Sequence, residues 1–269
     1  MDSASCRPAR DGAAVPGRRP IAGIGRVLLR DGFSLWIGRD AGRMQTHAHH
    51  AIQVSLALGG SFLIRGDGDG WAELTGAIVL PHRRHQFDGC GQSLAHLFVE
   101  PETVQGRALL ERHGESAVGA LDGDTAERLV AALREGYAAD APDEALLAAG
   151  QRSIALLAGS APPAVTVDPR IGRAIALMRS RLGGSISLAQ AAAAAHLSPS
   201  RFRHLFVAQT GVSFRAYLLW ARVNAAMGAV MGGQSWTEAA QEAGFADSAH
   251  LSRTCRRMFG IAPAMLLRQ

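Results

Sequence analysis

A group of histidines in the first third of the chain has the residue types and spacing of a ligand-binding site. It contains His47, His49 and His50, followed later by His82 and His85. Residues two apart in a β-strand point to the same face of the sheet, so His47 and His49 could bind one metal ion together through their imidazole nitrogens. Catalysis would also need an open coordination position and a substrate, and nothing in the sequence supplies these. The pattern therefore favours binding over turnover.

The C-terminal part of the chain has the charge of a phosphate-binding module. Residues 169–269 contain twelve arginines and three acids, a net charge of +9, whereas all 269 residues together carry +5. Residues 1–168 therefore carry −4. A basic module joined to a mildly acidic one is typical of a nucleic-acid-binding domain fused to a regulatory domain.

Two helix-turn-helix units are predicted to present this charge. In the first, Ser187 and Gln190 have the spacing of a capping box, and a second helix begins at Ser198-Pro199 and ends at Gly211. Phe202 and its helical neighbours form the apolar face of that second helix, which leaves its polar residues on the other face.

The same order of signals returns downstream. Ser235 and Glu238 have capping-box spacing, Gly244 makes a turn, and Asp247 or Ser248 begins a helix that ends near Phe259. One helix from Ser213 to about Met231 joins the two units, and at ~1.5 Å per residue it is roughly 28 Å long. Recognition helices on one side of B-DNA are roughly 34 Å apart, so this helix could hold both of them there.

The last hundred residues resemble the AraC/XylS family of bacterial transcription regulators. The matching segments are Leu197–Phe206, Thr210–Tyr217, Arg222 with Ala225 and Ala226, Ala243–Arg253, and Phe259–Pro263. The resemblance implies that residues 169–269 form an all-helical domain that binds double-stranded DNA and engages RNA polymerase. It also implies a transcription regulator in the bacterial cytoplasm. We expect an activator, although activation and repression both remain open.

Recognition helices place their N-terminal residues against base edges in the major groove. In the first such helix we expect base contacts from Ser200, Arg203 and His204, and a phosphate contact from Arg201. In the second helix, the family positions that face the groove are Ser248, Ala249, His250, Ser252 and Arg253. Five aromatic residues are expected to be core rather than base-stacking groups: Phe202, Phe206, Trp220, Phe245 and Phe259.

Short apolar runs separated by glycine-rich turns predict strands between Ile24 and about Val99, arranged as a small antiparallel barrel or jelly roll. The histidine group within this region resembles the cupin pattern. Carried over to this sequence, the resemblance implies four candidate ligands of a divalent metal (Zn, Fe, Mn or Ni) or of an organic molecule: His47, His49, Gln53 and His85. A metal site, a pocket for a small-molecule effector and a purely structural group of histidines all remain open.

The predicted fold class is α+β with two domains. A cupin-like sensor and dimerisation domain covers residues 21–159, residues 160–168 form a proline-containing linker, and the DNA-binding domain covers 169–269. Residues 1–20 read as a disordered arm. Helices predicted between positions 101 and 159 follow the strands, and the resemblance implies that they pair in a homodimer.

Two further features bear on location. The three cysteines are far apart with no CxxC pair, which predicts neither a zinc finger nor a disulfide framework and fits a reducing cytoplasm. No apolar run reaches the ~18 residues of a membrane span, so no membrane partner is expected.

The sequence thus predicts a DNA-binding regulator, not an enzyme, with a small-molecule sensor. The alternative is a metal-dependent cupin enzyme fused to a DNA-binding module.

Overall fold

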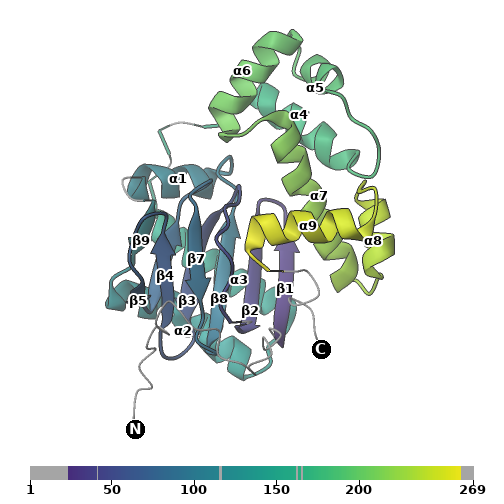
Figure 1. The fold of residues 1–269 in the computed structure, drawn as a ribbon. Helices are drawn as coiled ribbons and strands as arrows, with labels where there is room; N and C mark the ends of the chain where they lie inside the picture. Colours follow the sequence, from purple (N-terminus) through teal and green to yellow (C-terminus); the bar gives the residue numbers. More distant parts are fainter. Residues whose placement is uncertain (1–23, 41, 115–116, 162, 165, 262–269) are drawn as a thin grey trace.

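The computed structural model describes residues 24–40, 42–114, 117–161, 163–164 and 166–261. These residues form a sheet-rich N-terminal region followed by a helical C-terminal region (Figure 1). This mixed architecture agrees with the predicted fold class. The arm expected at residues 1–20 and the last eight residues of the expected DNA-binding domain lie outside the described part of the chain.

Antiparallel strands of the N-terminal region form a six-stranded sheet in the order β1-β2-β8-β3-β6-β9 and a three-stranded sheet in the order β5-β4-β7. Their bounds are β1 Ile24–Arg30, β2 Phe33–Arg39, β3 Ile52–Ala57, β4 Phe62–Gly66, β5 Ala72–Leu74, β6 Gly76–Val79, β7 His85–Asp88, β8 Ser93–Val99 and β9 Val118–Ala120.

The two sheets do not close into a barrel within the described residues. Strands β1 and β9 are the edges of the larger sheet, and neither pairs with the smaller one. The segment that approaches β7 makes only isolated bridges to it, Arg43 with Asp88 and His47 with His85. The predicted barrel or jelly roll is therefore not confirmed, because the strand pairings needed to close it are missing.

Side chains of the six-stranded sheet alternate between two different surroundings. On β8, Leu97 and Val99 join the core beneath the helices α1–α3, whereas His96 and Phe98 point to the opposite side. On that side, His96 Nδ1 lies 2.9 Å from Ser55 Oγ. The opposite side is the one that carries the histidine group.

Helices α1 (Val104–His113), α2 (Gly123–Ala138) and α3 (Asp143–Ala158) cover one face of the larger sheet. Their apolar residues Leu133, Leu146 and Ile154 are buried against that sheet, while Leu156 is 68% exposed. Most of the apolar surface of these helices, which the resemblance implies pair in a homodimer, is thus used for internal packing.

The C-terminal region contains the helices α4 Pro169–Ser180, α5 Leu188–Ala194, α6 Pro199–Thr210, α7 Phe214–Met231, α8 Trp236–Glu242 and α9 Ser248–Phe259. The first part of α7 packs with α4–α6 around Phe202, Phe206 and Tyr217, and its second part packs with α8 and α9 around Met227 and Leu251. One helix therefore belongs to both cores.

The two regions also share a core. Phe259 at the end of α9 packs on Trp36 of β2, with ring centroids 4.7 Å apart, and on Phe98 of β8 at 5.9 Å. Trp220 of α7 donates a hydrogen bond from Nε1 to Glu100 Oε1 at 3.1 Å. Trp220 and Phe259 are buried as predicted, but against the N-terminal region as well as within the helical region.

No helix in the described part of the chain is long and apolar enough to cross a bilayer. Cys255 is free and buried, and burial raises the pKa of its thiol to about 12.

Candidate nucleic-acid interface and buried histidine group

The first helix-turn-helix unit consists of α5 and α6. The predicted capping box is present: Gln190 N donates to Ser187 Oγ at 3.2 Å, and Ser187 N donates to Gln190 Oε1 at 2.8 Å. His196 makes the turn in the left-handed conformation, with φ 54°. Ser198 then accepts from Arg201 N at 3.4 Å to cap α6. Local hydrogen bonds thus fix where both helices start.

All four candidate residues on α6 are exposed: Ser200, Arg201, Arg203 and His204. Phe202 and Phe206, on the opposite face of the helix, are 0% exposed. Within the described residues neither Arg201 nor Arg203 forms an ion pair, so both guanidinium groups are available to an external anion.

The second unit, α8 and α9, repeats the first. Glu238 N donates to Ser235 Oγ at 3.2 Å and Ser235 N donates to Glu238 Oε2 at 2.9 Å, the second capping box. Gly244 makes the turn with φ 79°. Asp247 Oδ1 accepts from His250 N at 2.6 Å, so Asp247 is the cap and α9 begins at Ser248.

The candidates on α9 are presented unequally. Ala249 and Arg253 are exposed, whereas Ser248, His250 and Ser252 are half-buried. The His250 ring packs edge-on against Phe245, with centroids 5.2 Å apart, so part of this side chain supports the fold of the unit. Arg256 and Arg257 are exposed near the end of the helix.

The two units lie at opposite ends of α7, an 18-residue helix (Figure 1). At ~1.5 Å per residue α7 is roughly 27 Å long. An exposed arginine near the start of a recognition helix can bond O6 and N7 of one guanine together, while serine and histidine offer shorter polar contacts. The surface is therefore chemically suited to reading DNA bases.

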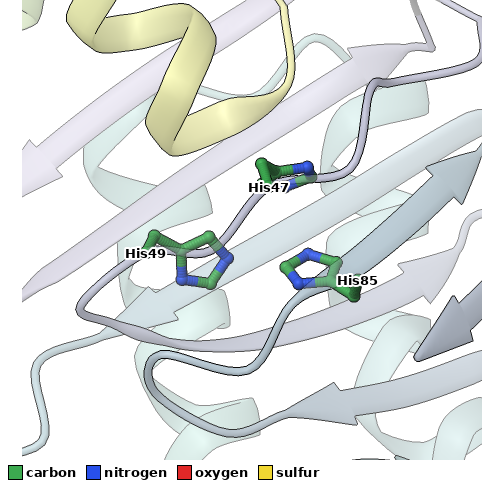
Figure 2. A group of neighbouring side chains, drawn as sticks. All are labelled: His47, His49 and His85. Atoms are coloured by element: carbon green, nitrogen blue, oxygen red, sulfur yellow. The ribbon is translucent and has the colours of Figure 1, made fainter. Parts of the chain in front are cut away.

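The structure brings the four candidate ligands of the N-terminal region together. His47, His49 and His85 are buried, and one ring nitrogen from each lies within 4.8 Å of the others (Figure 2). Gln53 is also buried, with Oε1 2.8 Å from His49 Nε2. His47 and His49 lie outside the regular strands, in the segment before β3. The strand alternation expected to pair them is therefore wrong, and the bridge between His47 and His85 contributes instead.

Burial keeps these imidazoles neutral at pH 7. Loss of hydration lowers the pKa of His47, His49 and His85 from 6.5 to about 3, and in each case a neighbouring histidine of the group lowers it further. Neutral imidazole is the form that offers a nitrogen lone pair to a metal ion.

A second polar group, not predicted from the sequence, lies where the two regions meet. Glu100, just after β8, accepts hydrogen bonds from Trp220 and from Arg179 of α4. Burial, together with the nearby Glu102, raises the pKa of Glu100 to about 7 despite the opposing charge of Arg179. No sequence pattern pairs these residues, which are far apart along the chain.

A cavity of about 370 Å³ adjoins this polar group. Both regions line it, with Leu29, Phe33, Phe98, Glu100, Arg179 and Trp220 among the lining residues. It is mainly apolar with a few charged groups at its wall, as small-molecule sites usually are.

Residues 191–269 match the family model of a helix-turn-helix domain. No curated protein matches the chain. Among solved structures, ToxT from Vibrio cholerae is 12% identical with a TM-score of 0.57, covering 89% of this chain and 100% of that chain.

Two further ToxT structures from Vibrio cholerae are similar and contain ligands. One, bound to an unsaturated fatty acid, is 11% identical with a TM-score of 0.52 and covers 87% of this chain and 94% of that chain. The other, bound to (E)-4-(8-methylnaphthalen-1-yl)but-3-enoic acid, is 11% identical with a TM-score of 0.55 and covers 88% of this chain and 100% of that chain. At such identities the similarity establishes the fold.

Proposed function

Since this chain ends in a helix-turn-helix domain of the AraC type, we propose that it is a sequence-specific, DNA-binding transcription regulator with a cupin-like N-terminal sensor. The observation that carries the proposal is the exposure of Ser200, Arg201, Arg203 and His204 on α6. They lie at the N-terminal end of a capped recognition helix whose other face is buried, so they are free to enter a major groove. Ala249 and Arg253 of α9 would read a second site.

Selection from a pool of random duplex DNA tests specificity directly. The full chain should enrich one motif with two contact regions about one helical turn apart, because α6 and α9 lie at opposite ends of α7. Binding of the pool without enrichment would leave a non-specific DNA-binding protein and overturn the proposal.

The sensor function rests on the cavity between the two regions. A small molecule in this cavity would contact β1, β2 and β8 on one side and α4 and α7 on the other. Its affinity would therefore change if the two regions changed their relative arrangement. An effector must bind two arrangements with different affinity in order to shift the protein between them. The ToxT structure with a bound unsaturated fatty acid supports an unsaturated fatty acid as the first ligand to test.

Thermal unfolding of the full chain with and without such a fatty acid would test the cavity. Ala225 lines it, so Ala225→Phe should fill part of the space and remove the rise in Tm seen with ligand. Ala176→Phe, at an exposed position on α4, is the matched control and should keep it. A rise that is equal in the Ala225→Phe variant would place the ligand elsewhere.

The remaining elements of the proposal follow the resemblance of the DNA-binding domain. They are contact with RNA polymerase and formation of a homodimer. The match of residues 191–269 to a helix-turn-helix domain supports a protein without catalytic activity. Analytical ultracentrifugation of the full chain, with and without the selected duplex, would test the dimer.

A further inference from the structure

The three clustered histidines share one hydrogen-bonding arrangement. Nδ1 of His47 lies 2.8 Å from Gln45 O, Nδ1 of His49 lies 2.8 Å from Ala51 O, and Nδ1 of His85 lies 3.0 Å from Arg83 O. A carbonyl oxygen only accepts, so each Nδ1 carries the ring proton, and this assigns the lone pair of each neutral ring to Nε2. Histidines that bind metals are commonly oriented in this way, with the second ring nitrogen donating to a carbonyl.

The Nε2 atoms of His85 and His49 lack a suitable hydrogen-bond donor within the described residues. His85 Nε2 is buried and has no hydrogen-bond partner within the described residues. His49 Nε2 faces Gln53 Oε1 at 2.8 Å, while the Gln53 amide nitrogen donates to Ser55 Oγ at 2.8 Å. With the proton on Nδ1, His49 Nε2 and Gln53 Oε1 are both acceptors. A cation in contact with both atoms, or a reversed amide, removes this conflict.

We propose that His47, His49 and His85 bind one divalent transition-metal ion through Nε2, with Gln53 beside the fourth position. Three imidazoles without a carboxylate favour zinc, copper, nickel or iron over magnesium or calcium. In a tetrahedral zinc site, with Zn–N near 2.0–2.1 Å, ligand nitrogens are roughly 3.4 Å apart. The present separations of up to 4.8 Å therefore require the rings to close moderately around the ion.

The end of the second recognition helix forms part of the wall of this site. Gln45 O holds His47 Nδ1, and Gln45 N donates to the carbonyl oxygen of Gly260, the C-cap of α9, at 3.1 Å. A Cβ built on Gly260 would lie 2.7 Å from His47 Nδ1 and 2.4 Å from Gln45 O. The Phe259 ring is 6.4 Å from the His49 ring. Ligand orientation and the seating of α9 thus depend on the same residues.

Metal binding should consequently change DNA affinity, an inference that rests on the proposed DNA-binding function. Gln45 contacts both His47 and Gly260, so we expect the orientation of His47, and with it the metal affinity, to depend on how α9 is seated. If the metal ion and DNA each bind more tightly to one position of α9, bound metal changes the DNA affinity, and bound DNA changes the metal affinity by the same factor. Coupling of this kind typically amounts to roughly 5-fold or more.

The first test measures zinc binding by the full chain. The protein is purified without a histidine affinity tag and is stripped of metal with a chelator. We expect about one zinc per chain, and cobalt should give the absorption bands of a tetrahedral site. His85→Gln should weaken zinc binding by roughly tenfold or more. His113→Gln, at a half-buried histidine on α1 and outside the trio, controls for loss of stability and should bind zinc normally. No uptake by the unaltered chain, or equal uptake by a folded His85→Gln variant, overturns the site.

The linkage is tested with the DNA motif obtained by selection, with and without zinc. Gly260→Ala should abolish the zinc effect because the new methyl group cannot fit against Gln45 and His47. Gly233→Ala is the matched control: Gly233 also has positive φ, 96°, but a Cβ there would meet nothing within 4 Å. A zinc effect that survives Gly260→Ala, or none in the unaltered chain, overturns the linkage. Loss of DNA binding in every condition would instead refute the proposed function.

Discussion

Arg203 and Arg256 are exposed arginines on the two recognition helices, but we expect them to contact different parts of the DNA. Arg203 lies in the N-terminal half of α6, where side chains reach base edges, and Arg256 lies near the end of α9. Arg203→Ala should therefore cost about 1–3 kcal/mol of discrimination at one base position. Arg256→Ala should weaken binding to all sequences and reduce the salt slope by about 0.9.

Dissociation constants on the selected motif and on random duplex, measured across a range of salt concentrations, separate the two roles. Equal losses on both DNAs for Arg203→Ala would show that this residue contacts phosphate and not a base.

The buried histidines should make the protein sensitive to acid. In the folded state the pKa of His47, His49 and His85 is about 3, below the unfolded value of 6.5. Between these values the unfolded chain binds more protons, so stability is fully present above about pH 6.5 and is lost as the pH falls. Each such histidine costs up to about 1.4 kcal/mol per pH unit.

Urea unfolding of the metal-free chain between pH 7.5 and pH 5 would measure this loss. His204→Gln, at an exposed position, should keep the same slope, whereas His85→Gln should flatten it. A slope unchanged by His85→Gln would mean that other groups cause the acid sensitivity.

At the scale of elements, the start of α9 depends on one carboxylate. Asp247 Oδ1 accepts from His250 N, and α9 carries candidate base contacts directly after this cap. Asp247→Ala should cost about 1 kcal/mol of unfolding free energy and weaken DNA binding, because the first turn of α9 frays.

Asp247→Asn keeps a capping oxygen and should behave nearly like the unaltered chain. Chemical unfolding and DNA titration of both variants would test the cap. If Asn and Ala are equally destabilising, the charge of Asp247 matters more than its hydrogen bond.

The helices of the C-terminal region could be predicted closely because their limits are local. The predicted capping and stop signals coincide with helix ends in the structure: Ser187 with Gln190, Ser198-Pro199, Ser235 with Glu238, and Gly211. The strands were also found, but their arrangement was not, since closure of a barrel depends on pairing between distant segments. Likewise His47 and His49 do converge with His85, yet through an irregular segment that strand alternation does not describe.

The meeting of the two regions could not be predicted at all. Burial of Trp220 and Phe259 gives the same apolar pattern whether the partner lies within the helical domain or on the sheet. The pairing of Glu100 with Arg179 leaves no mark on either local sequence. Contacts of this kind are properties of the whole molecule.

At that scale, Arg179 should stabilise the chain by compensating the buried Glu100 carboxylate. Arg179→Met removes the cation that lowers the pKa of Glu100, which is about 7 in its presence, so this pKa should rise. Above that pH the unfolded chain holds an ionised Glu100, whereas the folded chain must bury a charge or bind a proton. The loss of stability, about 1–3 kcal/mol, should therefore grow as the pH rises from 6 to 8.

Unfolding of Arg179→Met, and of the same variant with Glu100→Gln, would test the pair at both pH values. The added glutamine carries no charge, so it should remove the pH-dependent part of the loss. A loss independent of pH would indicate that Arg179 acts only through packing.

The aromatic contact between α9 and the sheet has a consequence for how the molecule melts. Trp36, Phe98, Trp220 and Phe259 belong to one core, although the first two and the last two come from different regions. Neither region can be removed without leaving large rings of the other in water. Calorimetry of the full chain should therefore show one heat-absorption peak, with equal calorimetric and van't Hoff enthalpies, where independent domains would show two. Either half expressed alone should be prone to self-association through its uncovered aromatic surface.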